Sequence, residues 1–247
     1  RRQMLQILEG REEKSAADKK LEISLWQQLG DIYSRRGQLD DAQQAYTQAV
    51  ELSPRSRNIR QKLATLSAER GSMEDSIGQQ RQLAQQAIEE EDWTRAIGAL
   101  EEILKYQPGD EETLHRLAEG YLKIGDSLRA GQKAELLLQS AERRLESEGV
   151  LRWAEFLLQL DPGRSDILQK QIGALLNSGR LEEAADHLWR LAEQLRGQNE
   201  TGAEQSACLR LLELGLDRFE LNRRAAERLF DLGLEARART ELERLAR

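Results

Sequence analysis

The stretch LWQQLGDIYSRRGQLDDAQQAYTQAVELSP, residues 25–54, predicts two helices joined at one glycine. Apolar and small residues recur at i, i+3, i+4 and i+7 before Gly37, and a second stripe follows it. Gly37 stands where a helix end favours a left-handed residue, and Pro54 stands where a helix cannot continue. Because Gly30 and Ala42 are small, the two helix axes can approach closely. The stretch therefore indicates an antiparallel helix pair. Its stripes are Trp26, Leu29, Gly30 and Tyr33, then Ala42, Tyr46 and Ala49.

These residues at these spacings resemble the tetratricopeptide repeat, including its Trp-Leu-Gly-Tyr, Ala-aromatic-Ala and Pro positions. The full pattern is present here, and only parts of it persist elsewhere in the chain. The resemblance implies an all-α fold, a right-handed helical solenoid of antiparallel helix pairs. It also implies a non-catalytic scaffold that binds a protein or peptide partner on its concave surface.

A different spacing replaces the first one farther along the chain. Gly37 and Gly71 are 34 residues apart, whereas Gly71, Gly125, Gly179 and Gly233 are 54 residues apart, as are Pro54, Pro108 and Pro162. A unit of this length holds three helices, so we predict a variant of the repeat with a three-helix, 54-residue period. Two arrangements stay open. Successive helices could alternate strictly between the two faces of the array, or each three-helix unit could keep the same faces, as armadillo repeats do.

The periodicity predicts one helical array over residues 21–247, preceded by a helix or linker over residues 1–20. The charged segment GREEKSAADKK reads as a linker or a helix extension. The expected helices cover residues 2–9, 21–36, 39–52, 57–70, 73–90, 93–106, 111–124, 127–146, 149–160, 165–178, 181–196, 202–215, 218–231 and 234–246.

Composition narrows the classes of partner. Hydrophobic residues make up 39% of the 247 residues, aromatics 4% and charged residues 33%, which suits a thin layer of stacked helices. The net charge of −7 argues against nucleic acid, and no apolar run approaches the roughly 18 residues of a membrane span. The chain opens with RRQML and not with methionine, so we expect a fragment that lacks its native N-terminus. A cytoplasmic location is favoured, but the sequence leaves it undetermined.

Candidates for chemistry are few. His115 and His187 have no neighbouring metal-ligand spacing, and Cys208 lies on an apolar helical stripe, which predicts a buried small side chain. The paired carboxylates between Glu89 and Glu112 are expected at helix N-termini, where the helix dipole favours acidic side chains. The alternative is an acidic surface patch that binds a basic partner. We therefore expect no enzyme activity, no metal and no cofactor. We expect the four tryptophans to pack in the core or groove, with partner anchoring as the less favoured alternative: Trp26, Trp93, Trp153 and Trp189.

The resemblance also implies where a partner would bind. In the family, peptides contact the first helix of each pair on the concave side. Carried onto this sequence, those positions are Gln27, Asp31, Ser34 and Arg35 in the first pair, and Asn58, Gln61 and Thr65 in the second. One subclass grips a C-terminal carboxylate with Lys and Asn, whose places Gln27 and Asp31 occupy here.

Three functions are compatible with these features. We favour an interaction scaffold that binds a protein or peptide partner. The scaffold chain itself is expected to be monomeric in isolation. A structural, self-assembling module is the second hypothesis. A regulatory domain of a larger, enzyme-containing protein is the third.

Overall fold

The computed structural model describes residues 2–9 and 15–245, and every regular element in them is an α-helix. The helices run in the order α1 (Arg2–Glu9), α2 (Ala16–Arg35), α3 (Leu39–Leu52), α4 (Arg57–Glu69), α5 (Met73–Glu89), α6 (Trp93–Tyr106), α7 (Glu111–Lys123), α8 (Ser127–Arg143), α9 (Ser147–Leu160), α10 (Ser165–Asn177), α11 (Leu181–Gly197), α12 (Thr201–Glu213), α13 (Phe219–Asp231) and α14 (Glu235–Leu245). The predicted all-α fold class is confirmed.

The start of α2 differs most from the expectation, because α2 begins at Ala16 and not at residue 21. Ser15 forms a capping box with Asp18: its hydroxyl accepts from the Asp18 N–H at 3.1 Å, and the Asp18 carboxylate accepts from the Ser15 N–H at 3.1 Å. The apolar stripe starts later, at Leu21, so periodicity alone set the boundary too late. The rest of the expected linker, residues 10–14, lies outside the described residues.

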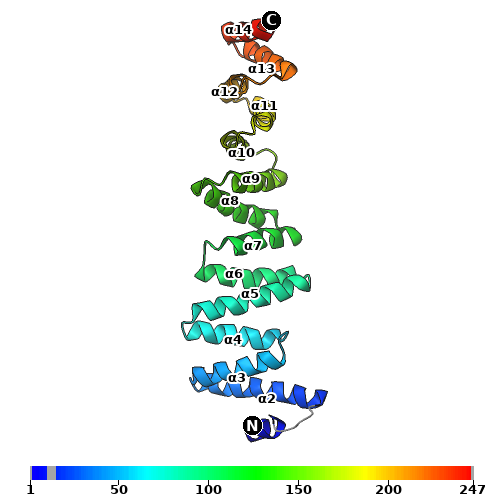
Figure 1. Cartoon of the computed structure of the whole chain (residues 1–247), viewed down its shortest axis with the longest axis vertical. Coiled ribbons are helices and arrows are strands. Elements are labelled where there is room, and N and C mark those ends of the chain that lie inside the picture. The colour runs from blue at the N-terminus through cyan, green and yellow to red at the C-terminus, as the bar shows by residue number, and fades with distance from the viewer. Residues whose placement is uncertain (1, 10–14, 246–247) are drawn as a thin grey trace. The chain divides into compact units, whose positions relative to one another are not determined.

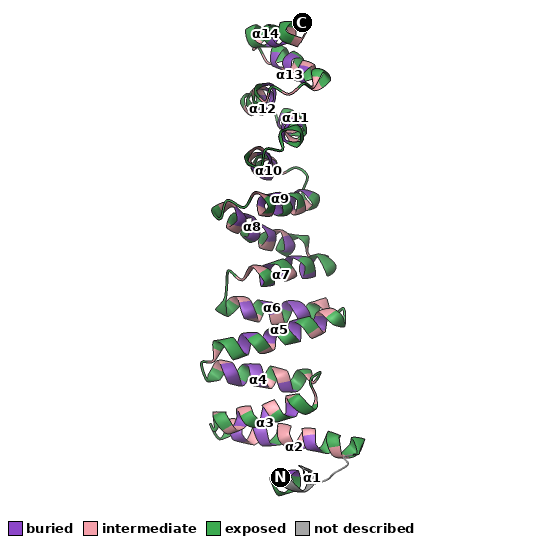
Figure 2. Ribbon diagram, in the orientation of Figure 1, coloured by how far each residue is buried: buried purple, intermediate pink, exposed green. Residues whose placement is uncertain are grey.

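The chain divides into two compact units, residues 1–130 and residues 131–247, with the division inside α8. Within unit 1, each helix from α1 to α7 packs against the next one, and the same holds from α9 to α14 in unit 2. Consecutive helices lie side by side in each unit (Figure 1). Buried and exposed residues alternate along each helix, as a stripe that faces neighbouring helices requires (Figure 2).

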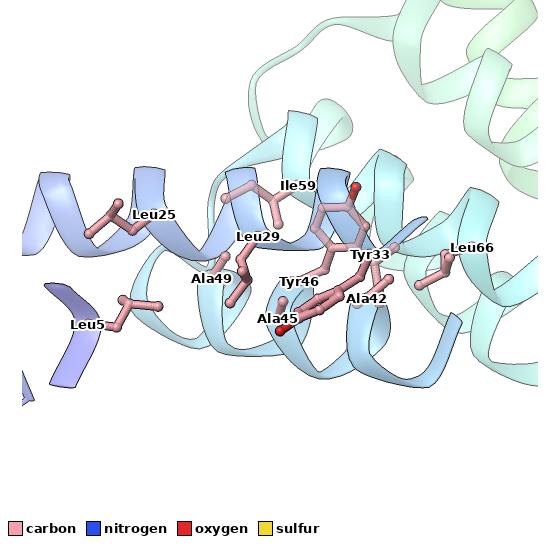
Figure 3. Packing of buried hydrophobic residues seen from close by; sticks show 11 residues of the cluster. Leu5, Leu25, Leu29, Tyr33, Ala42, Ala45, Tyr46, Ala49, Ile59 and Leu66 are labelled. Carbon is pink, nitrogen blue, oxygen red and sulfur yellow. The ribbon is translucent and has the colours of Figure 1, made fainter. Parts of the chain in front are cut away.

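The core of unit 1 begins where α2 meets α3 (Figure 3). The predicted close approach of these helices is confirmed at Gly30, where a Cβ atom would lie 2.6 Å from the Tyr46 ring. Ala42 and Ala49 are fully buried on α3, so small residues on both helices let a large ring fit between them. The cluster consists of Leu5, Leu25, Leu29, Tyr33, Ala42, Ala45, Tyr46, Ala49, Ile59, Leu63 and Leu66.

Unit 2 contains a buried ion pair that the sequence pattern does not reveal. The Arg228 guanidinium on α13 donates to the Glu204 carboxylate on α12 over 2.5 Å, and the Glu204 side chain is only 4% exposed. Because an unpaired charge at this depth would be strongly destabilising, the pair ties α12 to α13.

Left-handed residues mark the helix ends, as predicted for five glycines. Gly37, Gly71, Gly125, Gly179 and Gly233 have φ values between +72° and +83°. Three residues with side chains share this uncommon conformation at φ values of +57° to +59°: Glu91, Leu145 and Asn199. They follow Gly37 at successive intervals of 54 residues.

Candidate functional site

A small groove opens between α2 and α4, with α3 at its base. Its volume is about 200 Å³. Ser34 of α2 and Tyr46 of α3 line it together with one face of α4, formed by Gln61, Lys62, Thr65, Leu66 and Glu69. The α4 residues recur at i, i+1, i+4, i+5 and i+8, which places them on one side of the helix.

Three of the seven predicted contact residues line this groove: Ser34, Gln61 and Thr65. Gln61 and Thr65 are exposed, and Ser34 is half-buried. The Thr65 hydroxyl donates to the Gln61 carbonyl at 3.0 Å, one turn earlier in the helix. The structure thus brings Ser34 together with Gln61 and Thr65, which follow it by 27 and 31 positions in the sequence.

Asp31, another predicted contact residue, has hydrogen-bond partners on two neighbouring helices. The Tyr46 hydroxyl and the Lys62 ammonium both donate to Asp31 Oδ1, each over 2.6 Å. Partial burial pushes the pKa of Asp31 up, but the hydrogen bonds from Lys62 and Tyr46 outweigh it, so the pKa lies below the ordinary value. Because the carboxylate connects α2 to both α3 and α4, it holds the walls of the groove in place.

The remaining predicted contact residues lie outside the lining of the groove. Gln27 is half-buried on α2, whereas Arg35 and Asn58 are exposed. Arg35 is close enough to act electrostatically on Asp31 and Tyr46. These three residues therefore stay predicted contacts without a shared pocket.

Lys62, Leu66 and Glu69 also line the groove, although they are not among the predicted contact residues. Helical periodicity could have identified them, because Leu66 and Glu69 lie on the same face of α4 as the predicted residues Gln61 and Thr65. Tyr46 was recognised only as a packing residue. Its ring lies against Gly30, which has no side chain to displace it, and its hydroxyl donates to Asp31.

The other candidates for chemistry have ordinary environments. Cys208 is fully buried, and desolvation raises the pKa of its thiol to about 11, as expected for a small core side chain. His115 is exposed and lies 3.4 Å from the Glu119 carboxylate. In the described residues, no three His, Cys, Asp or Glu side chains gather as metal ligands would. Each helix in the same part of the chain is too short or too polar to cross a bilayer.

The acidic segment between Glu89 and Glu112 contains two N-caps, as helix-start chemistry predicts. The Asp92 carboxylate accepts from the Arg95 N–H at 3.0 Å, and the Asp110 carboxylate accepts from the Thr113 N–H at 3.3 Å. The tryptophans are mostly packed: Trp153 is buried, and Trp26, Trp93 and Trp189 are half-buried. The Arg224 guanidinium lies 4.7 Å from the centre of the Trp189 ring.

Several solved structures resemble the chain, all at low identity. The MamA protein is 16% identical over 72% of this chain and 94% of its own, with a TM-score of 0.26. A tetratricopeptide repeat protein from Parabacteroides merdae ATCC 43184 is 12% identical over 84% of this chain and 98% of its own, with a TM-score of 0.25. The tetratricopeptide domain of P58(IPK) is 17% identical over 93% of this chain and 77% of its own, with a TM-score of 0.26.

Comparison by sequence matches one segment of the chain to a known family. No curated protein matches the chain. Residues 23–66 match the family model for the tetratricopeptide repeat, and this range spans most of α2, all of α3 and most of α4. The match therefore covers most of the residues that form the groove between α2 and α4.

Proposed function

We propose that this chain is a non-catalytic interaction scaffold that binds a protein or peptide partner in the groove between α2 and α4. The observation that carries the proposal is the convergence of Ser34, Gln61 and Thr65 on one groove. Tetratricopeptide repeats generally mediate protein–protein interactions, and the helices that form this groove are the ones that match the family.

The groove combines a firm base with polar side chains that have capacity for a partner. Tyr46 and Lys62 are engaged by Asp31, so the base is held in place before a partner arrives. Gln61 offers an amide that can donate and accept, and Glu69 offers a carboxylate. A volume of about 200 Å³ suits one or two side chains of a bound segment, so we expect neighbouring surface to contribute the rest of the interface.

Filling the groove tests this function. Thr65→Arg places a long side chain at an exposed position that lines the groove, without removing a buried contact. Gln28→Arg is the matched control, because Gln28 is exposed on α2 and lies outside every described groove. Pull-down from the native extract should recover a partner with wild type and Gln28→Arg, and recover much less with Thr65→Arg. Equal recovery by both variants would refute binding in this groove.

We further propose that the array is built from three-helix blocks of 54 residues. Two series of left-handed residues support this organisation: Gly71, Gly125, Gly179 and Gly233 form one, and Gly37, Glu91, Leu145 and Asn199 form the other. Helix lengths support it as well, since α5, α8 and α11 have 17 residues each, and α4, α7, α10 and α13 have 13 each. The pattern continues across the division between the two units.

Deletion of whole repeats distinguishes this block from a simple two-helix repeat. Removing residues 72–125 joins Gly71 to Asp126 and preserves the 54-residue spacing, so we expect a folded protein. Removing residues 38–71 joins Gly37 to Ser72 and makes neighbours of α2 and α5, which hold the same position in successive blocks, so we expect a less stable protein. Circular dichroism during urea unfolding compares them. Greater stability of the second deletion would contradict the three-helix block.

A further inference from the structure

Three exposed apolar side chains of unit 2 lie at turns on one edge of the helix stack, and together they form the apolar edge: Leu145, Leu181 and Phe219. Leu145 is in the turn between α8 and α9, and Leu181 and Phe219 are the first residues of α11 and α13. Because short turns make consecutive helices antiparallel, every second turn lies on the same edge. The apolar edge is in a different unit from the groove between α2 and α4, so its role goes beyond the proposed function.

Ion pairs show that these turns are neighbours. The Arg180 guanidinium, in the turn before α11, lies 3.7 Å from the Glu148 carboxylate in the first turn of α9. The Arg218 guanidinium, in the turn before α13, donates to the Asp186 carboxylate of α11 over 2.6 Å. Each arginine connects its own turn to the helix that begins at the preceding turn on that edge. The three apolar side chains therefore follow one another along it.

Leu145 is the least expected residue of the apolar edge. It has a φ of +57° and is 88% exposed, the highest value for a large apolar residue in the described part of the chain. At intervals of 54 residues, the corresponding positions hold Gly37, Glu91 and Asn199. Glycine and asparagine tolerate the left-handed backbone better than leucine does. A leucine that neither fills the core nor suits its backbone is explained by contact with a partner.

The turn holds Leu145 in this exposed position. The Leu145 N–H donates to the Glu142 carbonyl at 3.1 Å, and the Glu146 N–H donates to the Ala141 carbonyl at 3.0 Å. These two bonds form the usual helix-ending pattern around a left-handed residue. The backbone at Leu145 is therefore fixed before a partner arrives, which lowers the entropic cost of binding.

The other two residues of the apolar edge also occupy positions that are mostly polar elsewhere in the chain. Phe219 is 54% exposed and Leu181 is 38% exposed. At intervals of 54 residues, Phe219 corresponds to Arg57, Glu111 and Ser165. At the same intervals, Leu181 corresponds to Met73, Ser127 and Glu235. The repeated structure therefore does not require an apolar side chain at either position.

Acidic side chains outnumber basic ones around the apolar edge. The three turns and the first four residues of the helices that follow them contain six carboxylates and three guanidinium groups. The positive end of a helix dipole is equivalent to about half a charge, so the starts of α9, α11 and α13 offset only about half of this excess. The surroundings therefore favour a partner with positive charge beside its apolar side chains. The carboxylates are those of Glu146, Glu148, Glu182, Glu183, Asp217 and Glu220, and the guanidinium groups those of Arg144, Arg180 and Arg218.

We propose that the apolar edge binds a basic amphipathic helix of a partner protein. The apolar face of such a helix covers Leu145, Leu181 and Phe219, and its lysine or arginine side chains meet the surplus carboxylates. A helix suits this row, because its apolar residues repeat along one face as the exposed side chains repeat along the edge. A second copy of the chain would bring two acidic edges together, and an anionic lipid surface would be repelled in the same way.

Fluorescence anisotropy with the full chain tests the proposal. The probe is a short fluorescein-labelled peptide of leucine and lysine, with its leucines spaced to form one face of a helix. One control peptide has glutamate in place of lysine, and a second has the same composition without the helical spacing. We expect saturable binding of the amphipathic lysine peptide alone. Leu145→Asn with Leu181→Ser and Phe219→Ser should raise its Kd by about tenfold or more.

The triple variant should fold, because each new residue already occurs at a corresponding position of this chain: Asn199, Ser127 and Ser165. It removes no buried side chain, and asparagine suits the left-handed backbone at position 145. We expect a urea midpoint at or above that of wild type. Unchanged stability with lost affinity separates a binding role from a structural one.

Leu122→Ser with Ile124→Ser and Leu128→Asn is the matched control variant. These residues are also exposed and apolar, and they lie beside the turn between α7 and α8 in unit 1, where acidic residues are not in excess. The control should keep the Kd within about twofold of wild type. Thr65→Arg should do the same, and a loss of affinity there would place the peptide in the groove between α2 and α4 and contradict the proposal.

Other outcomes would also overturn the proposal. Absence of saturable binding, equal binding of the glutamate peptide, or an equal loss in the control variant would each do so. Light scattering that finds a dimer of wild type but a monomer of the triple variant would assign the edge to self-association. Binding of phosphatidylglycerol vesicles that the triple variant loses would assign it to a membrane. If the triple variant does not fold, Leu145→Asn alone decides, with an expected rise in Kd of about threefold or more.

Discussion

Gly30→Ala should destabilise unit 1, although alanine is the better helix former. The new Cβ atom would lie 2.6, 2.7 and 2.9 Å from the Cε1, Cδ1 and Cζ atoms of Tyr46, whereas carbon atoms in good contact are about 3.5–4.0 Å apart. The ring cannot move freely, because its hydroxyl donates to Asp31 over 2.6 Å and Lys62 donates to the same oxygen.

The opposing effects have comparable sizes. Overpacking costs about 1–3 kcal/mol, and loss of the Tyr46 hydrogen bond costs about 1 kcal/mol. Replacing glycine by alanine inside a helix returns about 1 kcal/mol. We therefore expect the free energy of unfolding to fall by about 1–3 kcal/mol.

Urea unfolding followed by circular dichroism measures the change, and amide hydrogen exchange locates it. Faster exchange should be confined mainly to α2 and α3. Gly78→Ala is the matched control, because Gly78 is inside α5 and a Cβ there would meet nothing within 4 Å. The control should be as stable as wild type or up to about 1 kcal/mol more stable. If Gly30→Ala behaves like Gly78→Ala, the close approach of α2 and α3 is not a constraint.

Three further predictions concern unit 2. Arg228→Met should reduce the free energy of unfolding by about 3–5 kcal/mol in urea unfolding, because it leaves the buried Glu204 carboxylate unpaired. Adding Glu204→Met should restore much of this loss, and a double variant as unstable as Arg228→Met would argue against a stabilising Arg228–Glu204 pair. The Arg164 guanidinium holds the pKa of Asp166 below its ordinary value of 3.8, so the pair stabilises the fold above pH 3.8 and this stabilisation is lost as the pH falls through the lower pKa of the folded state. Wild type should be more stable than Asp166→Asn by at most about 1 kcal/mol, since the pair is largely exposed. Urea unfolding at a series of pH values should show that difference disappearing below the folded-state pKa. Cys208, buried and with its thiol pKa raised to about 11, should react with a thiol reagent in urea but hardly at all in buffer, and rapid labelling of the folded chain would contradict its burial.

The first helix pair could be predicted from its sequence because each of its signals is local. Apolar spacing, Gly37 and Pro54 give the helix faces and ends without any knowledge of distant residues. The small residue at position 30 also predicted a close approach, and the Tyr46 ring is the group that makes it. The capping box at Ser15 was missed because the apolar stripe starts later than the helix.

The candidate contact residues were harder to predict, because their surroundings depend on partners in other helices. Asp31 looked free on its own helix, but Lys62 lies 31 positions farther along the chain and reaches it only after folding.

Site-specific photo-crosslinking tests the central proposal, binding of a partner between α2 and α4, most directly. A benzophenone amino acid is placed at position 65 in the groove, or at position 28 as the control, and each protein is irradiated in the native extract. We predict a discrete adduct from position 65, absent from position 28 and competed away by excess wild-type chain. An adduct from position 28 with none from position 65 would contradict binding in this groove.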